Sequence, residues 1–392
     1  MIVAIFIVSI TTGAFALISQ AIGARNTLDA SHTVRQVVLL TGILGVATGA
    51  IGYTFAENIL ALLSMPDDVV DLGTQYLRVF FLGTPLLATQ FGMASCFNAA
   101  GDTTTPFYIN VCVNLVNVIA SYILIFGYWG VQPMGVAGAA LGTVLARGVG
   151  SLLCLAMLYS GRSRISILPG SFRPDRQRIR RILRIGIPSG IEGIFRDGSN
   201  ILFLKLIALT DNATAAVAAF AIGNQVMRVP LRTSLGLAIT ASTLVGQAIG
   251  EGDLAKAERR GWTVAAVGAS LLLILSALLA WFASDIIAAF TDDTSVIAIG
   301  TRYLYVVALQ GPMVAVVVCI SGSLSGAGDT KPNLYYTIAC QWGVMLPSAW
   351  LLAFPFGLDI DGIWLSMLIS ITAQCGLIVW TFARGHWKTR SV

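Results

Sequence analysis

Two carboxylic acids stand apart from the other acidic residues of this 392-residue chain. Of the 19 acids, 17 lie between long apolar stretches or at their ends, whereas Glu192 and Asp197 lie near the middle of the stretch 180–208. A carboxylate held away from water takes up a proton or a small cation, because its charged form is costly there. Glu192 and Asp197 are therefore candidates for an ion-coupling site.

Three arginines lie where they could pair with these acids. Arg196 follows Glu192 by four residues, so the two side chains share one face of a helix. Arg228 and Arg232 are again four residues apart and lie near the middle of the next apolar stretch. A permanently paired carboxylate would not exchange protons near neutral pH, so the same residues are equally compatible with an ion-pair cluster that fixes one helix to its neighbour. The sequence leaves both interpretations open.

Further polar side chains lie inside the apolar stretches. Arg147 is near the middle of the stretch 134–160, where a buried cation either binds a substrate or fixes neighbouring helices. Amide side chains in such stretches line a cavity or form hydrogen bonds between helices. The amides that are candidates for a substrate cavity are Asn114, Asn117, Gln225, Gln310 and Gln341.

The elements that must position these residues are membrane helices. The chain is 56% hydrophobic and only 11% charged. A helix needs about 20 apolar residues to cross a hydrocarbon core of about 30 Å, and the apolar runs are too long for the strands of a barrel. These features predict an all-α polytopic membrane protein. Eleven stretches qualify, at 1–22, 34–56, 72–98, 106–128, 134–160, 180–208, 214–247, 260–290, 297–325, 333–356 and 361–384.

The chain repeats itself at an offset of 227 residues. Gln20-Ala21-Ile22-Gly23 recurs at 247–250, and Ala100-Gly101-Asp102-Thr103 recurs at 327–330. The helix predicted at 180–208 would have its counterpart ahead of Met1. We therefore expect two pseudo-symmetric helical bundles related as parallel repeats, with 11 helices present of an expected 12. The expected parts are an N-terminal lobe at 1–160, a basic cytoplasmic linker at 161–179 and a C-terminal lobe at 180–392.

The distribution of charge predicts the orientation in the membrane. Arginines and lysines crowd the linker 161–179 and the loops of the same parity, whereas the alternate loops carry aspartates and glutamates. Because basic loops stay in the cytoplasm, we expect the linker and the C-terminus on the inner side of a bacterial cytoplasmic membrane. The net charge of +5 is then explained by the basic cytoplasmic loops, and nucleic acid is not an expected partner.

The cysteines and histidines predict neither a metal site nor an enzyme. The six cysteines occur singly in apolar stretches, and the two histidines, His32 and His386, lie near the ends of stretches. Neither pattern fits a zinc site or a nucleophile with its base. We expect no cofactor other than a coupling ion.

Several motifs resemble those of the multidrug and toxic compound extrusion (MATE) family. The segment 244–250 followed by Glu251-Gly252-Asp253 is similar to the family motif at the end of the eighth helix, and the segment 184–192 is similar to the start of the seventh. The two Ala-Gly-Asp-Thr turns agree with the family as well. The resemblance extends from the second helix onward and is strongest for the bacterial branch of DinF- and NorM-like proteins.

This resemblance implies a secondary antiporter that works by alternating access. Such a protein exports small lipophilic, often cationic, compounds in exchange for protons or sodium, and we expect a monomer in the bilayer. In the family an aspartate of the first helix handles the ion, in some branches together with a glutamate of the seventh, and a counterpart of that first helix is missing here. Arg196 stands one turn beyond Glu192, where sodium-coupled members place their acid, so we favour protons.

Two other functions remain open. A flippase for lipid-linked saccharides of the same superfamily would also have two six-helix lobes, and its pyrophosphate substrates would require unpaired cations. Unpaired arginines at 147, 196, 228 and 232 would therefore favour the flippase, and pairing with the acids would favour the drug antiporter. A chain without its first helix is also compatible with a remnant that no longer transports.

Overall fold

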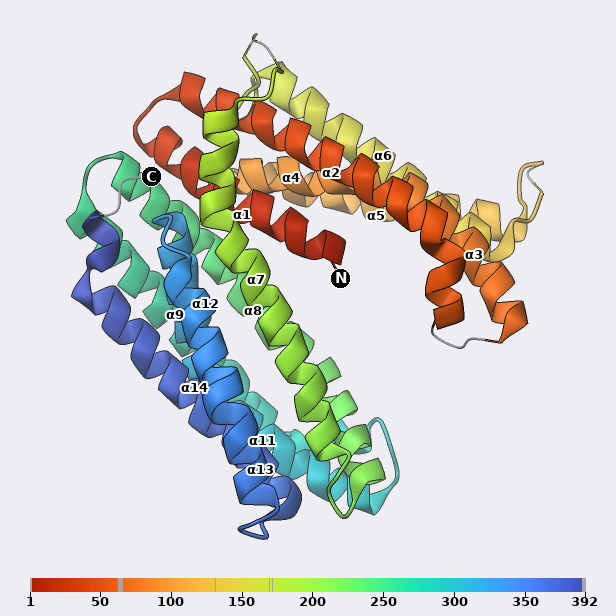
Figure 1. The fold of residues 1–392 in the computed structure, drawn as a ribbon, viewed down its shortest axis with the longest axis vertical. Coiled ribbons are helices and arrows are strands. Elements are labelled where there is room, and N and C mark those ends of the chain that lie inside the picture. Colours follow the sequence, from red (N-terminus) through yellow and green to blue (C-terminus); the bar gives the residue numbers. More distant parts are fainter. Residues whose placement is uncertain (1, 63–65, 131, 169, 171, 390–392) are drawn as a thin grey trace. The chain divides into compact units, whose positions relative to one another are not determined.

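The computed structural model describes residues 2–62, 66–130, 132–168, 170 and 172–389. This described part consists of helices and their connections, without a strand, as the sequence predicts (Figure 1). The chain divides into two compact units, Met1–Ile187 and Pro188–Val392. We call them the N-terminal unit and the C-terminal unit.

The described part of the N-terminal unit contains six helices and the beginning of a seventh. α3 and α4 form a bent pair that meets at Gly83, with an angle of 48° between the two segments. A Cβ atom at Gly83 would lie 2.3 Å from the Val144 side chain, so only glycine permits this close approach to α6. The bounds are α1 Ile2–Gly23, α2 Thr27–Leu62, α3 Asp67–Leu82, α4 Thr84–Ala99, α5 Thr104–Phe126, α6 Gly135–Ser160 and α7 Arg176–Ile207.

The C-terminal unit is held together by aromatic side chains from four helices. The ring centroids of Tyr303 and Trp364 are 4.6 Å apart, and Phe203 and Phe220 both pack on Trp364. This cluster joins α7, α8, α11 and α14. The remaining bounds are α8 Ala213–Gly250, α9 Leu254–Trp281, α10 Ala283–Ala288, α11 Thr294–Gly326, α12 Lys331–Thr337, the π-helix η1 Ile338–Met345, α13 Leu346–Ala353, α14 Asp359–Arg384 and the 3₁₀ turn η2 His386–Thr389.

The helix bounds carry the repeat of the sequence. Adding 227 to the bounds of α5 gives 331–353, which are the bounds of α12, η1 and α13 together. Adding 227 to α3 and α4 gives 294–309 and 311–326, which together make up α11. The predicted pair of repeated bundles is therefore confirmed, and the copies differ in where a helix is interrupted.

The protein is a multi-pass membrane protein. Eight described helices are long and apolar enough to cross a membrane, and the pair α3–α4 provides a ninth span. The other two predicted stretches are helical as well, but α7 begins with several arginines and the segment 331–353 is divided into three short pieces. Each of the eleven predicted stretches thus corresponds to a helical segment.

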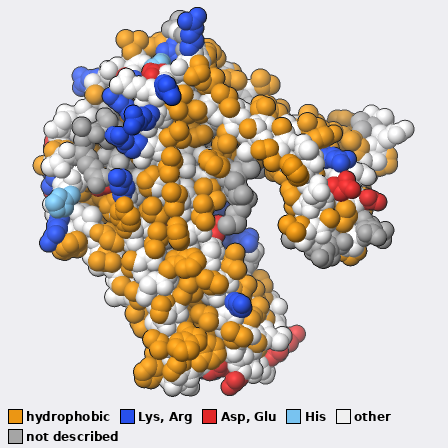
Figure 2. Space-filling view, in the orientation of Figure 1, with side chains coloured by type: hydrophobic (Ala, Val, Ile, Leu, Met, Phe, Trp, Pro, Cys, Tyr) orange, Lys and Arg blue, Asp and Glu red, His pale blue; other side chains and the backbone are white. Residues whose placement is uncertain are grey.

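The outer surface suits a lipid environment. Figure 2 shows hydrophobic side chains over most of the face in view, with basic side chains gathered around the beginning of α7. Bulky apolar groups such as Ile274, Leu273 and Trp380 are at least half exposed. In a bilayer such groups contact acyl chains, so their exposure carries no penalty.

Helix α7 crosses from one unit into the other. A Cβ atom at Gly13 of α1 would lie 1.9 Å from the carbonyl oxygen of Ile182, and one at Gly186 would lie 1.7 Å from that of Ser9. The two backbones therefore touch, and the first turns of α7 belong to the N-terminal unit. The two compact units divide between Ile187 and Pro188, within α7.

Candidate functional site

Glu192 is the centre of a polar cluster in the C-terminal unit. Its side chain is only 19% exposed, and its Oε1 atom lies 3.6 Å from Nη1 of Arg196. Arg196 is 54% exposed and stands on the next turn of the same helix. The ion pair therefore links no two helices, and Arg196 can swing away without any helix moving.

Neutral side chains from two other helices complete the surroundings of Glu192. Thr337 of α12 donates from Oγ1 to Glu192 Oε1 over 3.4 Å, and Gln374 of α14 donates from Nε2 to Thr337 Oγ1 over 3.5 Å. Thr337 is almost fully buried. One carboxylate with neutral oxygen neighbours is a donor set that suits a proton or a small hard cation.

A second set of contacts fixes α7 against η1. Ser199 donates from Oγ to Gln341 Oε1 over 2.7 Å, and the indole nitrogen of Trp342 donates to the backbone oxygen of Phe195 over 3.0 Å. The rings of Phe195 and Trp342 meet edge to face, with centroids 5.8 Å apart. These contacts lie on either side of Arg196 and hold the carboxylate-bearing turn of α7 in place.

The π-helix η1 has a cause in the sequence. Pro347 lies in the first turn of α13 and has no N–H group, and its ring would clash with the carbonyl of Gly343 in a regular α-helix. The wider turn avoids this clash, and the N–H of Leu346 donates to the carbonyl of Gln341, five residues earlier. Widened turns of this kind occur often at functional sites. Here the turn lets the consecutive residues Gln341 and Trp342 both contact α7.

Asp197 and two arginines of α8 lie apart from this cluster. No ion pair within 4.0 Å joins Arg228 or Arg232 to Glu192 or Asp197 in the described chain, so the pairing that the sequence suggested is not formed. Both arginines are exposed, whereas Asp197 is partly buried. The reason is the rotation of α8, which turns its small residues towards the core and its arginines away from it.

In the N-terminal unit, Arg147 has neutral partners. Its Nη1 donates to Gln90 Oε1 over 3.3 Å, and its guanidinium lies 5.6 Å from the ring centroid of Phe91. Both partners are on α4. No carboxylate pairs with Arg147 in the part of the chain that the structure describes.

The remaining amides fall into different environments. Asn117 donates from Nδ2 to Thr143 Oγ1 over 3.2 Å and so joins α5 to α6. Asn114 and Gln225 are exposed, without a hydrogen bond to the described chain. Gln310 is buried in α11, and its Nε2 has no partner among the described residues. Gln341 forms its hydrogen bond with Ser199 of α7, the helix that carries Glu192.

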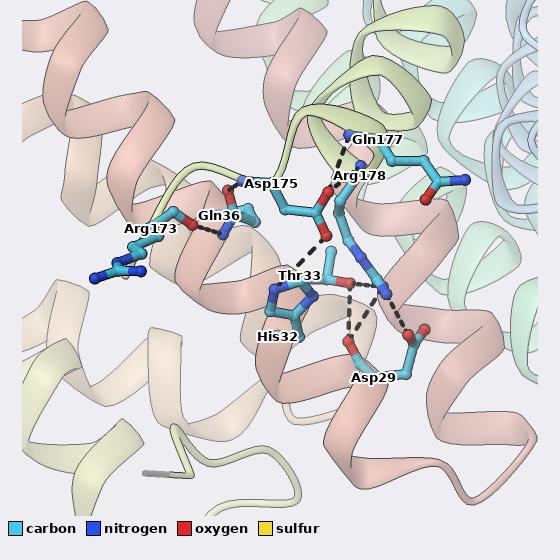
Figure 3. Close-up of polar contacts among 8 residues, drawn as sticks. All are labelled: Asp29, His32, Thr33, Gln36, Arg173, Asp175, Gln177 and Arg178. Carbon is cyan, nitrogen blue, oxygen red and sulfur yellow. Dashed lines mark hydrogen bonds and ion pairs between the residues drawn. The ribbon is translucent and has the colours of Figure 1, made fainter. Parts of the chain in front are cut away.

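The linker and the first turn of α7 are bound to α2. Asp175 accepts hydrogen bonds from two N–H groups in the first turn of α7, and its own N–H donates to Gln36 Oε1 over 3.0 Å (Figure 3). Arg178 donates to Asp29 and, over 2.8 Å, to Thr33 Oγ1. The N–H of Arg178, followed by that of Gln177 and the nearby cations, lowers the pKa of the Asp175 carboxyl below its usual range.

The sequence interpretation found Glu192, Arg196 and Gln341 but missed other residues that form these two sets of contacts. Ser199, Thr337 and Trp342 are residue types that occur widely in membrane helices, so their types alone carry little information. The repeat offers a signal, since Thr337 and Gln341 correspond to Asn110 and Asn114. Both copies thus have polar residues at the same two positions.

The sequence matches a family model and is similar to two bacterial proteins. The family model MatE matches residues 1–123 and 188–351. A probable multidrug resistance protein NorM of Thermotoga maritima is 26% identical, over 100% of this chain and 84% of that protein. The probable multidrug resistance protein YoeA of Bacillus subtilis is 24% identical, over 99% of this chain and 84% of that protein.

Solved structures share the fold. An outward-facing multidrug resistance MATE family transporter of the MOP superfamily has a TM-score of 0.88 and 21% identity, and the match covers 98% of this chain and 85% of that one. A MOP superfamily transporter from Pyrococcus furiosus, described as having a binding pocket of reverse polarity, has a TM-score of 0.88 and 20% identity, with 100% and 86% covered.

The repeated helical units place the protein among membrane transporters that are built from two copies of one bundle. The matched residues make up well over half of the chain. The chain belongs to the MatE family.

Proposed function

We propose that this protein is a secondary antiporter that exports lipophilic or cationic toxic compounds in exchange for protons. It would work as a monomer in a bacterial cytoplasmic membrane, with its C-terminus in the cytoplasm, and would alternate between inward-facing and outward-facing states. Membership of the MatE family and the multidrug resistance names of the relatives from Thermotoga maritima and Bacillus subtilis support drug export.

The observation that carries the proposal is the environment of Glu192. Its side chain is 19% exposed, its basic partner Arg196 approaches only to 3.6 Å, and Thr337 offers a neutral hydroxyl at 3.4 Å. A carboxylate with one loose cation can lose that cation and take up a proton, and the two protonation states would then bind Arg196 differently. Exchange would follow if the protonated and deprotonated forms favour conformations that bind the exported compound with different affinity.

Dye efflux from proteoliposomes tests this proposal. The purified chain would be reconstituted with rhodamine 6G, and efflux would be followed after a proton gradient is imposed. Glu192→Gln should abolish gradient-driven efflux and retain gradient-free dye exchange, whereas Glu57→Gln, at an exposed ion pair with Arg78, should behave as the wild type. Gradient-driven efflux by Glu192→Gln at the wild-type rate would disprove the coupling role.

Sodium is the competing coupling ion. A sodium gradient at constant pH should drive little efflux, because Arg196 occupies the space beside Glu192 that a second carboxylate would need for a sodium site. Asp197→Asn belongs in the same series, since Asp197 is the other carboxylate in the middle of α7. Efflux that depends on the sodium gradient and not on the proton gradient would show that sodium is the coupling ion.

Export of lipid-linked saccharides is a second candidate. It is favoured by Arg147, Arg228 and Arg232, which form no ion pair within the described residues. A fluorescent lipid-linked pyrophosphate saccharide in the same proteoliposomes would distinguish the two functions. Its movement to the outer leaflet, read by a membrane-impermeant reductant, should be absent from the antiporter and rapid in a flippase.

A further inference from the structure

One face of α8 carries four polar side chains within nine residues. Asn224, Gln225, Arg228 and Arg232 are all exposed, and they form no hydrogen bond or ion pair with other described residues. On the opposite face, small residues pack into the core. The polar face therefore contributes nothing to the packing of the C-terminal unit.

The two arginines lie deep along the helix. Arg228 is 15 residues from the first residue of α8 and Arg232 is 18 residues from the last, which correspond to about 22 Å and 27 Å. A charged side chain at such a depth costs several kcal/mol in contact with lipid, and it is found where a protein provides water or a counter-charge. The arginines thus require an anion or a water-filled space.

The C-terminal unit does not supply enough negative charge. The middle parts of α7 and α8 contain three arginines and two carboxylates, and one of these carboxylates, Glu192, lies beside Arg196. Asp197 offsets at most one of the two arginines on α8. The segments 263–281, 295–326, 332–353 and 362–383 of the neighbouring helices contain neither Asp nor Glu.

Apolar side chains flank the polar face. Val229 is 67% exposed, Leu231 44% and Leu235 49%. A compound that binds here meets guanidinium groups and aliphatic groups side by side. This combination matches an amphiphile whose head is negative and whose body is apolar.

We propose that Arg228 and Arg232, with Asn224 beside them, recognise the anionic head group of an amphiphilic compound, such as a carboxylate, sulfonate or phosphate. A guanidinium presents two parallel donors that fit such oxygen pairs, and an amide can supply one more. This inference rests on the proposed export function and adds lipophilic compounds that carry an anionic group to its substrates.

Binding of two related dyes tests the inference. The chain in phosphatidylcholine nanodiscs would be titrated with sulforhodamine B, which carries a net negative charge, and with rhodamine 6G, a cation of similar shape. Arg228→Gln with Arg232→Gln should weaken sulforhodamine B binding by about tenfold or more, because two charge-assisted contacts are lost. The same substitutions should leave rhodamine 6G binding unchanged or tighter.

Matched variants separate recognition from general charge effects. Arg259→Gln, at an exposed position near the start of α9, removes the same charge elsewhere and should not change binding of either dye. Arg228→Lys with Arg232→Lys should give an intermediate affinity, since the charge remains and the paired donors do not. Sulforhodamine B binding that is equal in the wild type and the double glutamine variant would overturn the inference.

The outcome is distinguishable from failure of the export function. Gradient-driven export of rhodamine 6G without any arginine-dependent binding of sulforhodamine B would support the antiporter function and contradict the anion site. Arginine-dependent binding of sulforhodamine B without export of either dye would support the anion site and contradict the antiporter function. Nanodiscs that contain phosphatidylglycerol identify the source of the anion: competition would mean that a lipid phosphate occupies the site, and no competition would mean a free organic anion.

Discussion

Helix α5 and the segment α12–η1–α13 occupy the same positions of the repeat, yet their middles differ. α5 runs as one α-helix from Thr104 to Phe126, whereas its copy contains the π-helix 338–345. Ala120 in α5 corresponds to Pro347 in the copy. A proline that only the second copy has therefore contributes to a change in which side chains that copy presents to its neighbour.

The two copies also differ in what lies against them. In the C-terminal unit, Thr337 and Gln341 receive or donate hydrogen bonds across to α7. Their counterparts Asn110 and Asn114 are exposed on α5, without a hydrogen bond to the described residues. The same polar positions thus build a site in one copy and leave a bare polar surface in the other.

The largest effect should come from Ala120→Pro, which places the proline of one copy in the other. α5 has no widened turn, so the substitution should lower the free energy of unfolding by about 3 kcal/mol or more. The carbonyl of Val116 would also lose its donor where water is absent. Unfolding of the purified protein in mixed micelles measures this loss, with Ala120→Val as control. Unchanged stability would mean that α5 forms its own π turn.

Pro347→Ala makes the reciprocal change and should act on transport more than on stability. With a regular α-helix, residues before position 347 would rotate by about 100°, which moves Gln341 away from Ser199. We expect rhodamine 6G efflux to fall roughly tenfold, equivalent to about 1.4 kcal/mol. Pro332→Ala, at the start of α12 and ahead of η1, is the control and should retain efflux. Efflux by Pro347→Ala at the same rate as by Pro332→Ala and the wild type would show that η1 has no role in transport.

The turns that lead into the two copies provide a pH-dependent comparison. Burial would raise the pKa of the Asp102 carboxyl, but hydrogen bonds from Ser163, from the backbone and side chain of Thr105 and from Thr104 outweigh it and lower the pKa. The corresponding Asp329 is buried. Because the folded pKa of Asp102 is depressed, its stabilisation is present above the unfolded pKa and is lost as the pH falls through the folded pKa.

Asp102→Asn should therefore cost about 1 kcal/mol at pH 7. The cost should vanish at a pH below the depressed pKa, where the wild-type carboxyl is itself protonated. Unfolding curves of both proteins at neutral and strongly acidic pH measure this difference. A cost that does not change with pH would assign the effect to packing.

The smallest effects should come from truncating one polar group in each copy. Ser199→Ala removes the 2.7 Å hydrogen bond to Gln341 and should cost about 0.6 kcal/mol, a typical value for a hydrogen bond between membrane helices. Asn114→Ala, at the exposed counterpart of Gln341, should change stability by almost nothing. Thermal unfolding of both variants tests the contrast. A larger loss in Asn114→Ala would show that α5 has a partner in the membrane.

The helices could be predicted from sequence because the length of an apolar run and the repeat offset depend on local composition. The π-helix could not, since the stretch 333–356 has the same hydropathy in either helical form. Pro347 does signal an interruption of the helix, but the form that the interruption takes depends on contacts with α7. The linker gave no signal of its attachment to Gln36, because that contact joins residues far apart in the chain.

The candidate site was predictable only in part for a similar reason. Glu192 and Arg196 are four residues apart on one helix, so their proximity follows from helix geometry. Pairing of Arg228 or Arg232 with an acid depends on how α8 is rotated in the bundle. That rotation is set by the small residues that pack α8 against its neighbours, and charge spacing along the sequence does not report it.

The passage of α7 through both units has a consequence for biogenesis. The backbone of α1 is closed off at Gly13 and Ser9 by residues of α7, which a ribosome delivers only after all of α2 to α6. The N-terminal unit therefore remains unfinished until the chain has emerged beyond Gly186, when the same nascent helix is already starting the C-terminal unit. The last backbone contacts of α1 thus form late in synthesis, after the five helices that follow it have been made.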